Sequence, residues 1–433
     1  MERFVLQKLI EWKNSPGRKP LVVKGARQVG KTWLVREFGR SDFQSFAYIN
    51  CDSNNTASEL FEQDFDVKRI IRGLSAISDV SIEPGNTLIF LDEIQEIPRA
   101  VQSLKYFCED ASEYYVIAAG SLLGIRDHKN ISFPVGKIDS LQMYPMSFFE
   151  FLLAVSGKPM EQMVSESALE DLSALHSKLT EYLRQYYFTG GMPEVVKAFA
   201  DGRSPQQVRR LQNQILSDYR DDISKHAPKD QIVRIDQVWN SIPAQLAKEN
   251  RKFIYANIRK GARAREFETA IQWLCNAGIV YQIGRVAKGD LPLKFYEDFA
   301  AFKLYFLDCG LMGALTEAPA SQILIGNNFF SEYKGAFTEQ YVLQQLKTVL
   351  DTSIYYLSAD DSKQELDFIF QDGEKVVPVE VKAEENLRAK SMRQFCLDHP
   401  GTKGIRISMS PYREQDWMTN IPLYGTERIL QAI

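Results

Sequence analysis

The sequence predicts an α/β protein of several domains, and three observations support this fold class. Its 433 residues exceed what one ordinary hydrophobic core holds, so we expect about two to four domains. The first third alternates short apolar runs with helical segments, which is typical of a parallel sheet covered on both faces. The rest predicts a helical middle followed by a small α/β tail.

Composition narrows the class of protein. Hydrophobic residues make up 45% and charged residues 25% of the chain, as in globular rather than disordered or fibrous proteins. The formal net charge of −4 does not indicate nucleic-acid binding, which would need a local basic patch. The five scattered cysteines and four histidines have no zinc-binding spacing. We expect a reduced, cytoplasmic protein with neither a signal peptide nor a membrane span.

Residues 1–155 are expected to form the first domain. Short apolar runs in it are predicted strands, each bounded by turn or helix signals. Continuous apolar runs favour parallel pairing, because both faces of such a sheet are buried. The predicted strands are Leu21–Lys24, Phe46–Ile49, Thr87–Leu91, Tyr115–Ala119 and Ile138–Met143.

A glycine-rich loop of the form GxxxxGK[ST] stands between the first predicted strand and a helix at Trp33–Phe38. Backbone N–H groups of such a loop can cradle phosphates at the positive end of the helix. Lys31 would reach the β- and γ-phosphates, and Thr32 would offer a hydroxyl to Mg²⁺. The sequence therefore predicts an ATP site made of Gly25, Ala26, Arg27, Gln28, Val29, Gly30, Lys31 and Thr32.

The second half of this site is the apolar run Leu88–Leu91, which leads into Asp92 and Glu93. Asp92 at the strand tip can hold a water on Mg²⁺. Glu93 beside it can orient and polarise the attacking water. A strand of this kind is weak evidence alone, but after a phosphate-binding loop it predicts hydrolysis of ATP.

These motifs resemble a prokaryotic AAA-family ATPase that is fused to a C-terminal domain of unknown function. The resemblance covers nearly the whole chain, and the ATPase motifs are its most specific part. It implies ATP as ligand, Mg²⁺ as cofactor and ATP hydrolysis as activity. Besides the phosphate-binding loop, it rests on Leu91–Pro98 (LDEIQEIP), Gly120–Leu123 (GSLL), Pro145–Phe151 (PMSFFEF) and Gly190–Glu194 (GGMPE).

The resemblance bears on two further positions near the phosphates. It implies that Ser121 is a catalytic sensor between the Walker B carboxylates and the γ-phosphate; a plain serine at a strand end is the alternative. Lys137 stands where relatives often have an arginine finger. Lysine is a point charge and cannot make the bidentate contact of arginine, so the identity of any finger is left open.

Residues 331–433 are expected to form a small α/β domain that resembles the PD-(D/E)xK core of restriction endonucleases. The resemblance rests on an order of elements and on the acidic residues placed along it. The expected order is a helix at 332–350, strands at 354–357, 365–370 and 376–382, a helix at 389–397 and a strand at 404–409.

Four charged residues form the candidate site of this tail. Strand alternation puts Glu380 and Lys382 on one face. Asp367 and Glu380, with Glu339 from the preceding helix, would bind a second Mg²⁺ or Mn²⁺ through oxygen ligands. Lys382 would orient or activate water and stabilise the negative charge of the phosphorane. The alternative is a solvated charged face with no catalytic role.

Between these domains we expect a helical lid or linker at 156–230 and a winged-helix-like domain at 231–315. The latter is predicted from helices followed by strands at Ile279–Val286 and Leu293–Asp298. Basic residues precede and begin its second helix, where phosphate contacts with DNA would arise. An ordinary solvated face is the alternative. The residues are Arg259, Lys260, Arg263 and Arg265.

Three hypotheses for function follow from these motifs. The first is a nucleotide-driven switch or motor on DNA whose nuclease-like tail cuts. The second is a regulatory ATPase whose C-terminal domains only bind DNA or a protein partner. The third makes the tail a scaffold for a homo-oligomer. None of the three involves a membrane.

Overall fold

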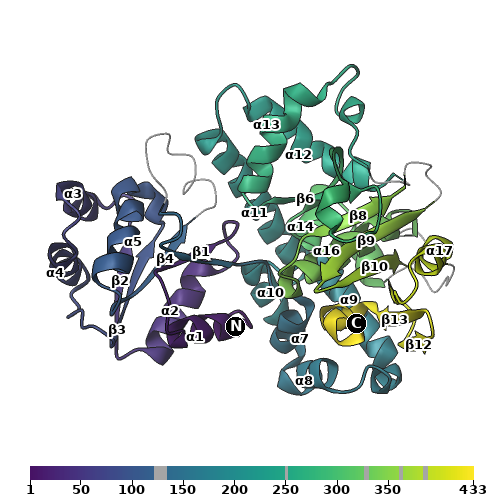
Figure 1. The fold of residues 1–433 in the computed structure, drawn as a ribbon, viewed down its shortest axis with the longest axis horizontal. Coiled ribbons are helices and arrows are strands. Elements are labelled where there is room, and N and C mark those ends of the chain that lie inside the picture. The colour runs from purple at the N-terminus through teal and green to yellow at the C-terminus, as the bar shows by residue number, and fades with distance from the viewer. Residues whose placement is uncertain (121–133, 249–251, 326–330, 360–363, 384–388) are drawn as a thin grey trace. The chain divides into compact units, whose positions relative to one another are not determined.

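The computed structural model describes residues 1–120, 134–248, 252–325, 331–359, 364–383 and 389–433 (Figure 1). These residues form two compact units. The N-terminal unit consists of Arg3–Tyr144 with Asn276–Gly278. The C-terminal unit consists of Pro145–Cys275 and Ile279–Ile433 with Met1–Glu2.

The N-terminal unit is built on a parallel sheet with the strand order β2-β3-β4-β1-β5. Every neighbouring pair in it is parallel. All the strands predicted from apolar runs in this unit are present, so the predicted parallel α/β sheet is confirmed. The strands are β1 (Leu21–Lys24), β2 (Ser45–Asn50), β3 (Thr87–Asp92), β4 (Tyr115–Gly120) and β5 (Asp139–Gln142).

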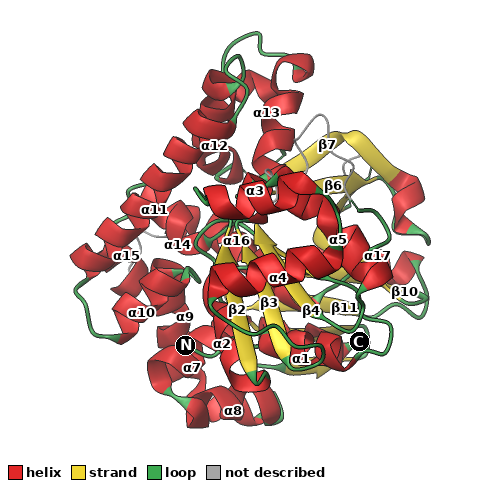
Figure 2. Ribbon diagram, turned by 90° about the vertical axis from the view of Figure 1, so that its left-hand side faces the viewer, coloured by secondary structure: helices red, strands yellow, loops and turns green. Residues whose placement is uncertain are grey.

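Amphipathic helices cover this sheet. In α4, buried Val67, Ile70 and Leu74 recur at helical spacing, and Asp66 caps the helix by accepting from the N–H groups of Lys68 and Arg69. Apolar residues of α3, α4 and α5 share one core with the sheet, and these helices lie in front of β2–β4 in Figure 2. The helices are α1 (Leu6–Asn14), α2 (Lys31–Asp42), α3 (Asn55–Gln63), α4 (Val67–Ser78), the 3-10 helix η1 (Ile94–Glu96) and α5 (Pro98–Asp110).

The C-terminal unit contains a mixed sheet with the order β12-β13-β11-β10-β9-β8-β6-β7. The pairs β6–β8, β10–β11 and β11–β13 are parallel. The other pairs are antiparallel. The strands are β6 (Val280–Val286), β7 (Glu297–Phe306), β8 (Ile354–Ser358), β9 (Glu365–Asp372), β10 (Lys375–Lys382), β11 (Gly404–Ser408), β12 (Arg413–Gln415) and β13 (Met418–Pro422).

Helices make up most of the remainder of the C-terminal unit. Those before β6 are α7 (Phe148–Ser156), α8 (Lys158–Glu166), η2 (Asp171–Leu175), α9 (His176–Thr189), α10 (Pro193–Ala200), α11 (Pro205–His226), α12 (Ile232–Leu246), η3 (Tyr255–Asn257) and α13 (Ala264–Asn276). Those after β6 are η4 (Leu293–Tyr296), α14 (Cys309–Leu315), α15 (Ala320–Ile325), α16 (Ser331–Val349), α17 (Lys390–Asp398) and η6 (Leu423–Ala432).

The tail follows the predicted order of elements: α16, β8, β9, β10, α17, β11. The chain adds β12 and β13, which sequence analysis did not predict. Its sheet also extends to β6 and β7, because β6 pairs in parallel with β8. The two strands predicted as the ribbon of a winged helix are therefore part of the tail's sheet.

The second of those strands was placed too early. Leu293–Tyr296 form η4, and β7 runs from Glu297 to Phe306. Its second half is buried at every position, including Lys303. A lysine inside an apolar run obscured the strand, and its burial requires a partner from another element.

The paired glycines of the GGMPE segment have a structural role. Gly190 has φ +72°, in the left-handed region, and a Cβ there would collide with the carboxylate of Asp308. Gly191 donates its N–H to Asp308 Oδ2 at 2.6 Å, and Leu311 donates to Oδ1 at 3.0 Å. Asp308 is fully buried, and these bonds hold the α9–α10 turn against the start of α14.

Candidate nucleotide site

The phosphate-binding loop spans the end of β1 and the start of α2. Gly30, with φ +94°, turns the chain into the helix in a left-handed conformation that glycine adopts without strain. At the other end of the loop, a Cβ on Gly25 would lie 2.5 Å from the carbonyl oxygen of Met143. The two glycines of the motif therefore serve a turn and a close approach of backbones.

Lys31 is the first residue of α2, and it is only 7% exposed. Its Nζ donates to the carbonyl oxygens of Gly25 at 3.0 Å and Ala26 at 2.8 Å. Burial lowers the pKa of Lys31 to about 8, against the opposing charges of Glu93 and Asp92. The lysine predicted to reach the phosphates is thus a buried cation inside the loop, bonded to neutral carbonyls.

Thr32 and Asp92 join the two halves of the site. Thr32 Oγ1 donates to Asp92 Oδ2 at 2.9 Å, and the hydroxyl of Tyr48 donates to the same oxygen at 3.2 Å. Burial, together with the charge of Glu93, raises the pKa of Asp92, while the two hydrogen bonds oppose this shift. A hydroxyl and a carboxylate in contact are hard oxygen ligands of the kind Mg²⁺ prefers.

Glu93 follows the tip of β3 in a left-handed conformation, with φ +50°. Such strain in a residue other than glycine recurs at functional sites. Its N–H donates to Asp92 Oδ1 at 3.2 Å, and Gln95 Nε2 donates to its carboxylate at 2.6 Å. Gln95 therefore fixes the orientation of the side chain predicted to act on water.

Sequence analysis missed Tyr48 and Gln95. Tyr48 lies on β2 in register with Phe90, two residues before the pair Asn50–Asp92. Strand alternation places Tyr48 on the same face as Asn50, a signal that becomes usable once β2 is known to adjoin β3. The guanidinium of Arg36 lies 3.9 Å from the centre of the Tyr48 ring, so it supports this tyrosine.

In the tail, the structure brings Asp367, Glu380 and Lys382 together. Asp367 Oδ2 accepts the N–H of Val381 at 2.8 Å, and Lys382 Nζ lies 2.7 Å from Glu380 Oε1. Burial raises the pKa of Glu380, Lys382 lowers it, and the nearby charge of Asp367 raises it further. Lysine and glutamate on one face of β10 agree with the predicted alternation.

Glu339 has different partners. It is fully buried on α16, 3.4 Å from the Nζ of Lys303, and the hydroxyl of Tyr305 donates to the same oxygen. Among the residues that the structure describes, no three His, Cys, Asp or Glu side chains gather closely enough to hold a metal ion. Lys303 places a buried cation beside Glu339, and the second metal site of Glu339, Asp367 and Glu380 stays a prediction.

The basic segment that leads into the first turn of α13 is open to solvent. Arg259, Lys260, Arg263 and Arg265 are all exposed. Arg259 forms an ion pair with Glu266 at 2.5 Å, and its guanidinium lies 5.8 Å from the ring centre of Phe267. Acidic Glu266 thus reduces the free positive charge of this segment.

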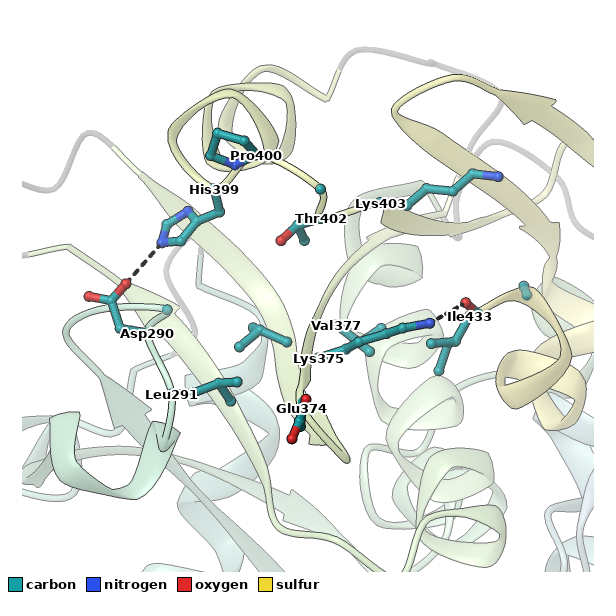
Figure 3. A pocket seen from close by; sticks show the side chains of 14 residues that line it. Asp290, Leu291, Glu374, Lys375, Val377, His399, Pro400, Thr402, Lys403 and Ile433 are labelled. Atoms are coloured by element: carbon teal, nitrogen blue, oxygen red, sulfur yellow. Dashed lines mark hydrogen bonds and ion pairs between the residues drawn. The ribbon is translucent and has the colours of Figure 1, made fainter.

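A cavity of about 380 Å³ lies elsewhere in the C-terminal unit, and Figure 3 shows its lining. His399 Nε2 and Asp290 Oδ1 are 3.5 Å apart on one side of it. Lys375 donates to the carbonyl oxygen of Ile433 at 3.2 Å on the other. Neither Lys382 nor the carboxylates predicted as metal ligands line this cavity.

Comparison with protein families agrees with the geometry of the N-terminal unit. Residues 17–152 match a family described as "AAA domain". This region is thus similar to AAA-type P-loop domains, and it is called the AAA domain below. Two matches cover later parts of the chain, and both families are described as domains of unknown function: DUF8612 over residues 180–322 and DUF4143 over residues 334–424.

Solved structures that resemble the chain include three archaeal proteins. The Walker-type ATPase PABY2304 of Pyrococcus abyssi is 15% identical, with 72% of this chain and 94% of that chain covered, at a TM-score of 0.44. The ORC1 protein of Aeropyrum pernix, in complex with DNA, is 15% identical over 74% and 93%, at 0.29. Cdc6p of Pyrobaculum aerophilum is 12% identical over 72% and 92%, at 0.27. No curated protein matches the chain.

Two positions of the AAA domain complete the comparison with the sequence. Ser121, the predicted sensor, lies outside the described residues. Lys137 pairs with Glu109 of α5 at 2.8 Å, and this bond raises the pKa of the lysine.

Within the described part of the chain, no helix is long and apolar enough to cross a membrane.

Proposed function

We propose that the AAA domain binds ATP with Mg²⁺ and hydrolyses it. The observation that carries this proposal is the 2.9 Å bond from Thr32 Oγ1 to Asp92 Oδ2, which joins the phosphate-binding loop to the tip of β3. Thr32 and Asp92 would hold Mg²⁺, which when bound neutralises charge on the phosphates. Thr32 on α2 and Asp92 on β3 lie side by side, as two residues that bind one metal ion must.

We assign binding of the phosphates to Lys31 and activation of the attacking water to Glu93. Lys31 would exchange the carbonyls of Gly25 and Ala26 for phosphate oxygens, which are stronger acceptors for a buried ammonium. Glu93, oriented by Gln95, would accept a hydrogen bond from the attacking water and polarise it. Sensing of the γ-phosphate is assigned to Ser121.

Titration with a fluorescent ATP analogue tests the proposal. Lys31→Ala should abolish binding, because no other side chain of the loop supplies a buried cation. Lys24→Ala is the matched control: this lysine precedes the loop, but its Nζ bonds to Ser140. Affinity near that of the wild type in Lys31→Ala would refute the assignment.

We further propose that nucleotide state is coupled to binding of DNA by the C-terminal unit. The exposed basic segment of Arg259, Lys260, Arg263 and Arg265 supports this role. Cleavage is not part of the proposal, because Glu339 is paired with the buried cation of Lys303. A regulatory ATPase that binds DNA or a protein partner without cutting is thus favoured over a nuclease.

The salt dependence of DNA affinity tests this second proposal. Replacing the four basic residues with Ala should flatten the log–log slope by up to about 0.9 for each phosphate that the variant no longer neutralises. A matched control replaces Arg203, Lys229 and Lys375, which are exposed elsewhere in the same unit. An unchanged slope in the first variant would show that the four basic residues do not contact phosphates of DNA.

A further inference from the structure

Arg3 connects the phosphate-binding loop to Tyr144, where the main segment of the N-terminal unit ends. It is 5% exposed and lies just before α1. Its Nη1 donates to the carbonyl oxygen of Val29 at 2.8 Å, and its Nη2 donates to that of Tyr144 at 2.8 Å. Val29 belongs to the loop, and the chain passes to the C-terminal unit between Tyr144 and Pro145. A guanidinium suits this bridge because its donors point in fixed directions.

A second contact joins the same two segments. The N–H of Met143 donates to the carbonyl oxygen of Lys24 at 2.7 Å. The carbonyl oxygen of Met143 in turn packs against Gly25, where a Cβ would not fit. Met143 and Tyr144 therefore border the loop at its first glycine and, through Arg3, at Val29.

Binding of phosphates should change the hydrogen bonds within the loop. Lys31 Nζ donates to the carbonyl oxygens of Gly25 and Ala26, and Gly25 is the residue in contact with Met143. Phosphate oxygens that take up the ammonium deprive both carbonyls of a charged donor. The change in hydrogen bonding thus arises at Gly25, which is in contact with Met143. Met143–Tyr144 are the exit segment of the N-terminal unit.

We propose that Arg3 is a positioning residue that holds the loop against Met143–Tyr144 and transmits nucleotide binding to this exit from the N-terminal unit. The inference rests on the proposed binding of ATP. Arg3 touches neither nucleotide nor Mg²⁺ in this scheme; it acts through the backbone of Val29 and Tyr144. Its loss should separate nucleotide binding from the response of the exit segment.

Hydrogen–deuterium exchange of the full chain, with and without Mg²⁺ and a non-hydrolysable ATP analogue, tests the proposal. In the wild type, the nucleotide should change exchange across Met143–Phe151. Arg3→Gln should still bind the analogue, with affinity lowered by about tenfold or less, the equivalent of one hydrogen bond. The change in exchange should be lost in this variant and partly restored in Arg3→Lys, which keeps the charge.

Arg18→Gln is the control, because Arg18 also donates to backbone carbonyls, of Ser112 and Glu113, away from the loop. It should respond like the wild type. The inference is overturned if both Arg3 variants keep the full change, or if the saturated wild type shows none. A wild type that fails to bind in the titration overturns the proposed ATP site itself, so the two failures are distinguishable. If Arg3→Gln does not fold, Arg3→Lys alone decides, since it should show a reduced change.

Discussion

The nucleotide site and the Lys303–Glu339 pair of the C-terminal unit both place a buried lysine near carboxylates, yet the two lysines have different partners. In the AAA domain, Lys31 bonds to the neutral carbonyls of Gly25 and Ala26, which the proposed function has it exchange for phosphates. In the C-terminal unit, Lys303 lies against the carboxylate of Glu339. A carboxylate that already has a buried cation is a poor ligand for another. In the proposed function Lys31 is available to an anion, whereas Lys303 is already paired with a carboxylate.

Topology explains how each set of predicted residues comes together. In a parallel sheet the carboxyl ends of all strands lie at one edge, so the loop after β1 and the tip of β3 meet there. The tail sheet is mixed, and Asp367 and Glu380 meet only because β9 and β10 are antiparallel neighbours. Glu339 comes from a helix, whose position the strand pattern does not determine.

The largest effect we expect concerns the buried pair of Lys303 and Glu339. Lys303→Met should destabilise the chain by about 3–5 kcal/mol, because it leaves Glu339 buried without its cation. Chemical denaturation followed by circular dichroism measures this. The double variant Lys303→Met/Glu339→Leu should regain most of the stability, since a buried ion pair is often replaceable by apolar groups. A destabilisation below about 1 kcal/mol in the single variant, the level of an exposed pair, would show that Lys303 contributes little to Glu339.

The next prediction concerns catalysis in the AAA domain. Glu93→Gln should bind ATP but hydrolyse it about a hundredfold more slowly, because an amide keeps the shape without polarising water. Steady-state phosphate release measures the rate. Glu96→Gln is a nearby control on η1. A rate within about threefold of the wild type, far above that expected without a general base, would remove Glu93 from this role.

A smaller effect comes from the titration of Lys31. Its pKa of about 8 means that the ammonium is lost as pH rises through that value. Since phosphates bind the charged form, ATP affinity should fall about tenfold between pH 7 and pH 9. Lys31→Arg, which stays charged over this range, should show no such fall. An equal fall in both proteins would point to another titrating group.

More of the AAA domain than of the remaining chain could be predicted from the sequence, because its strands and motifs are determined by residues close together in the chain. The strands, the loop and the Asp92–Glu93 pair each follow from a short segment whose geometry is set by its own residues. The order α16, β8, β9, β10, α17, β11 was also predictable from periodicity. The attachment of β6 and β7 to that sheet was not, because strand pairing over a long separation leaves no mark in either segment.

Buried polar residues account for the other differences. Lys303 interrupts an apolar strand, and its significance appears only when Glu339 is seen beside it. Tyr48 likewise gains a role from Asp92 on the neighbouring strand β3. These two pairs are tertiary contacts, so residue type and spacing in one sequence cannot assign them. Gln95 and Glu93 meet within one turn, where the strained backbone of Glu93 decides the contact.

The smallest effect we expect is on metal binding in the tail, and it tests the comparison most directly. Asp367→Ala and Glu380→Gln should leave Mn²⁺ uptake by the full chain unchanged, because Glu380 already pairs with Lys382 at 2.7 Å and Asp367 already accepts the N–H of Val381. Calorimetric titration measures uptake, and Asp92→Asn, in the nucleotide site, is the contrasting variant in which it should fall. Lys382→Ala should also have no effect. If Asp367→Ala lowers uptake while Lys382→Ala preserves or raises it, the carboxylates act as ligands and the cation as their neighbour. The tail would then be a metal site despite the pairing of Glu339.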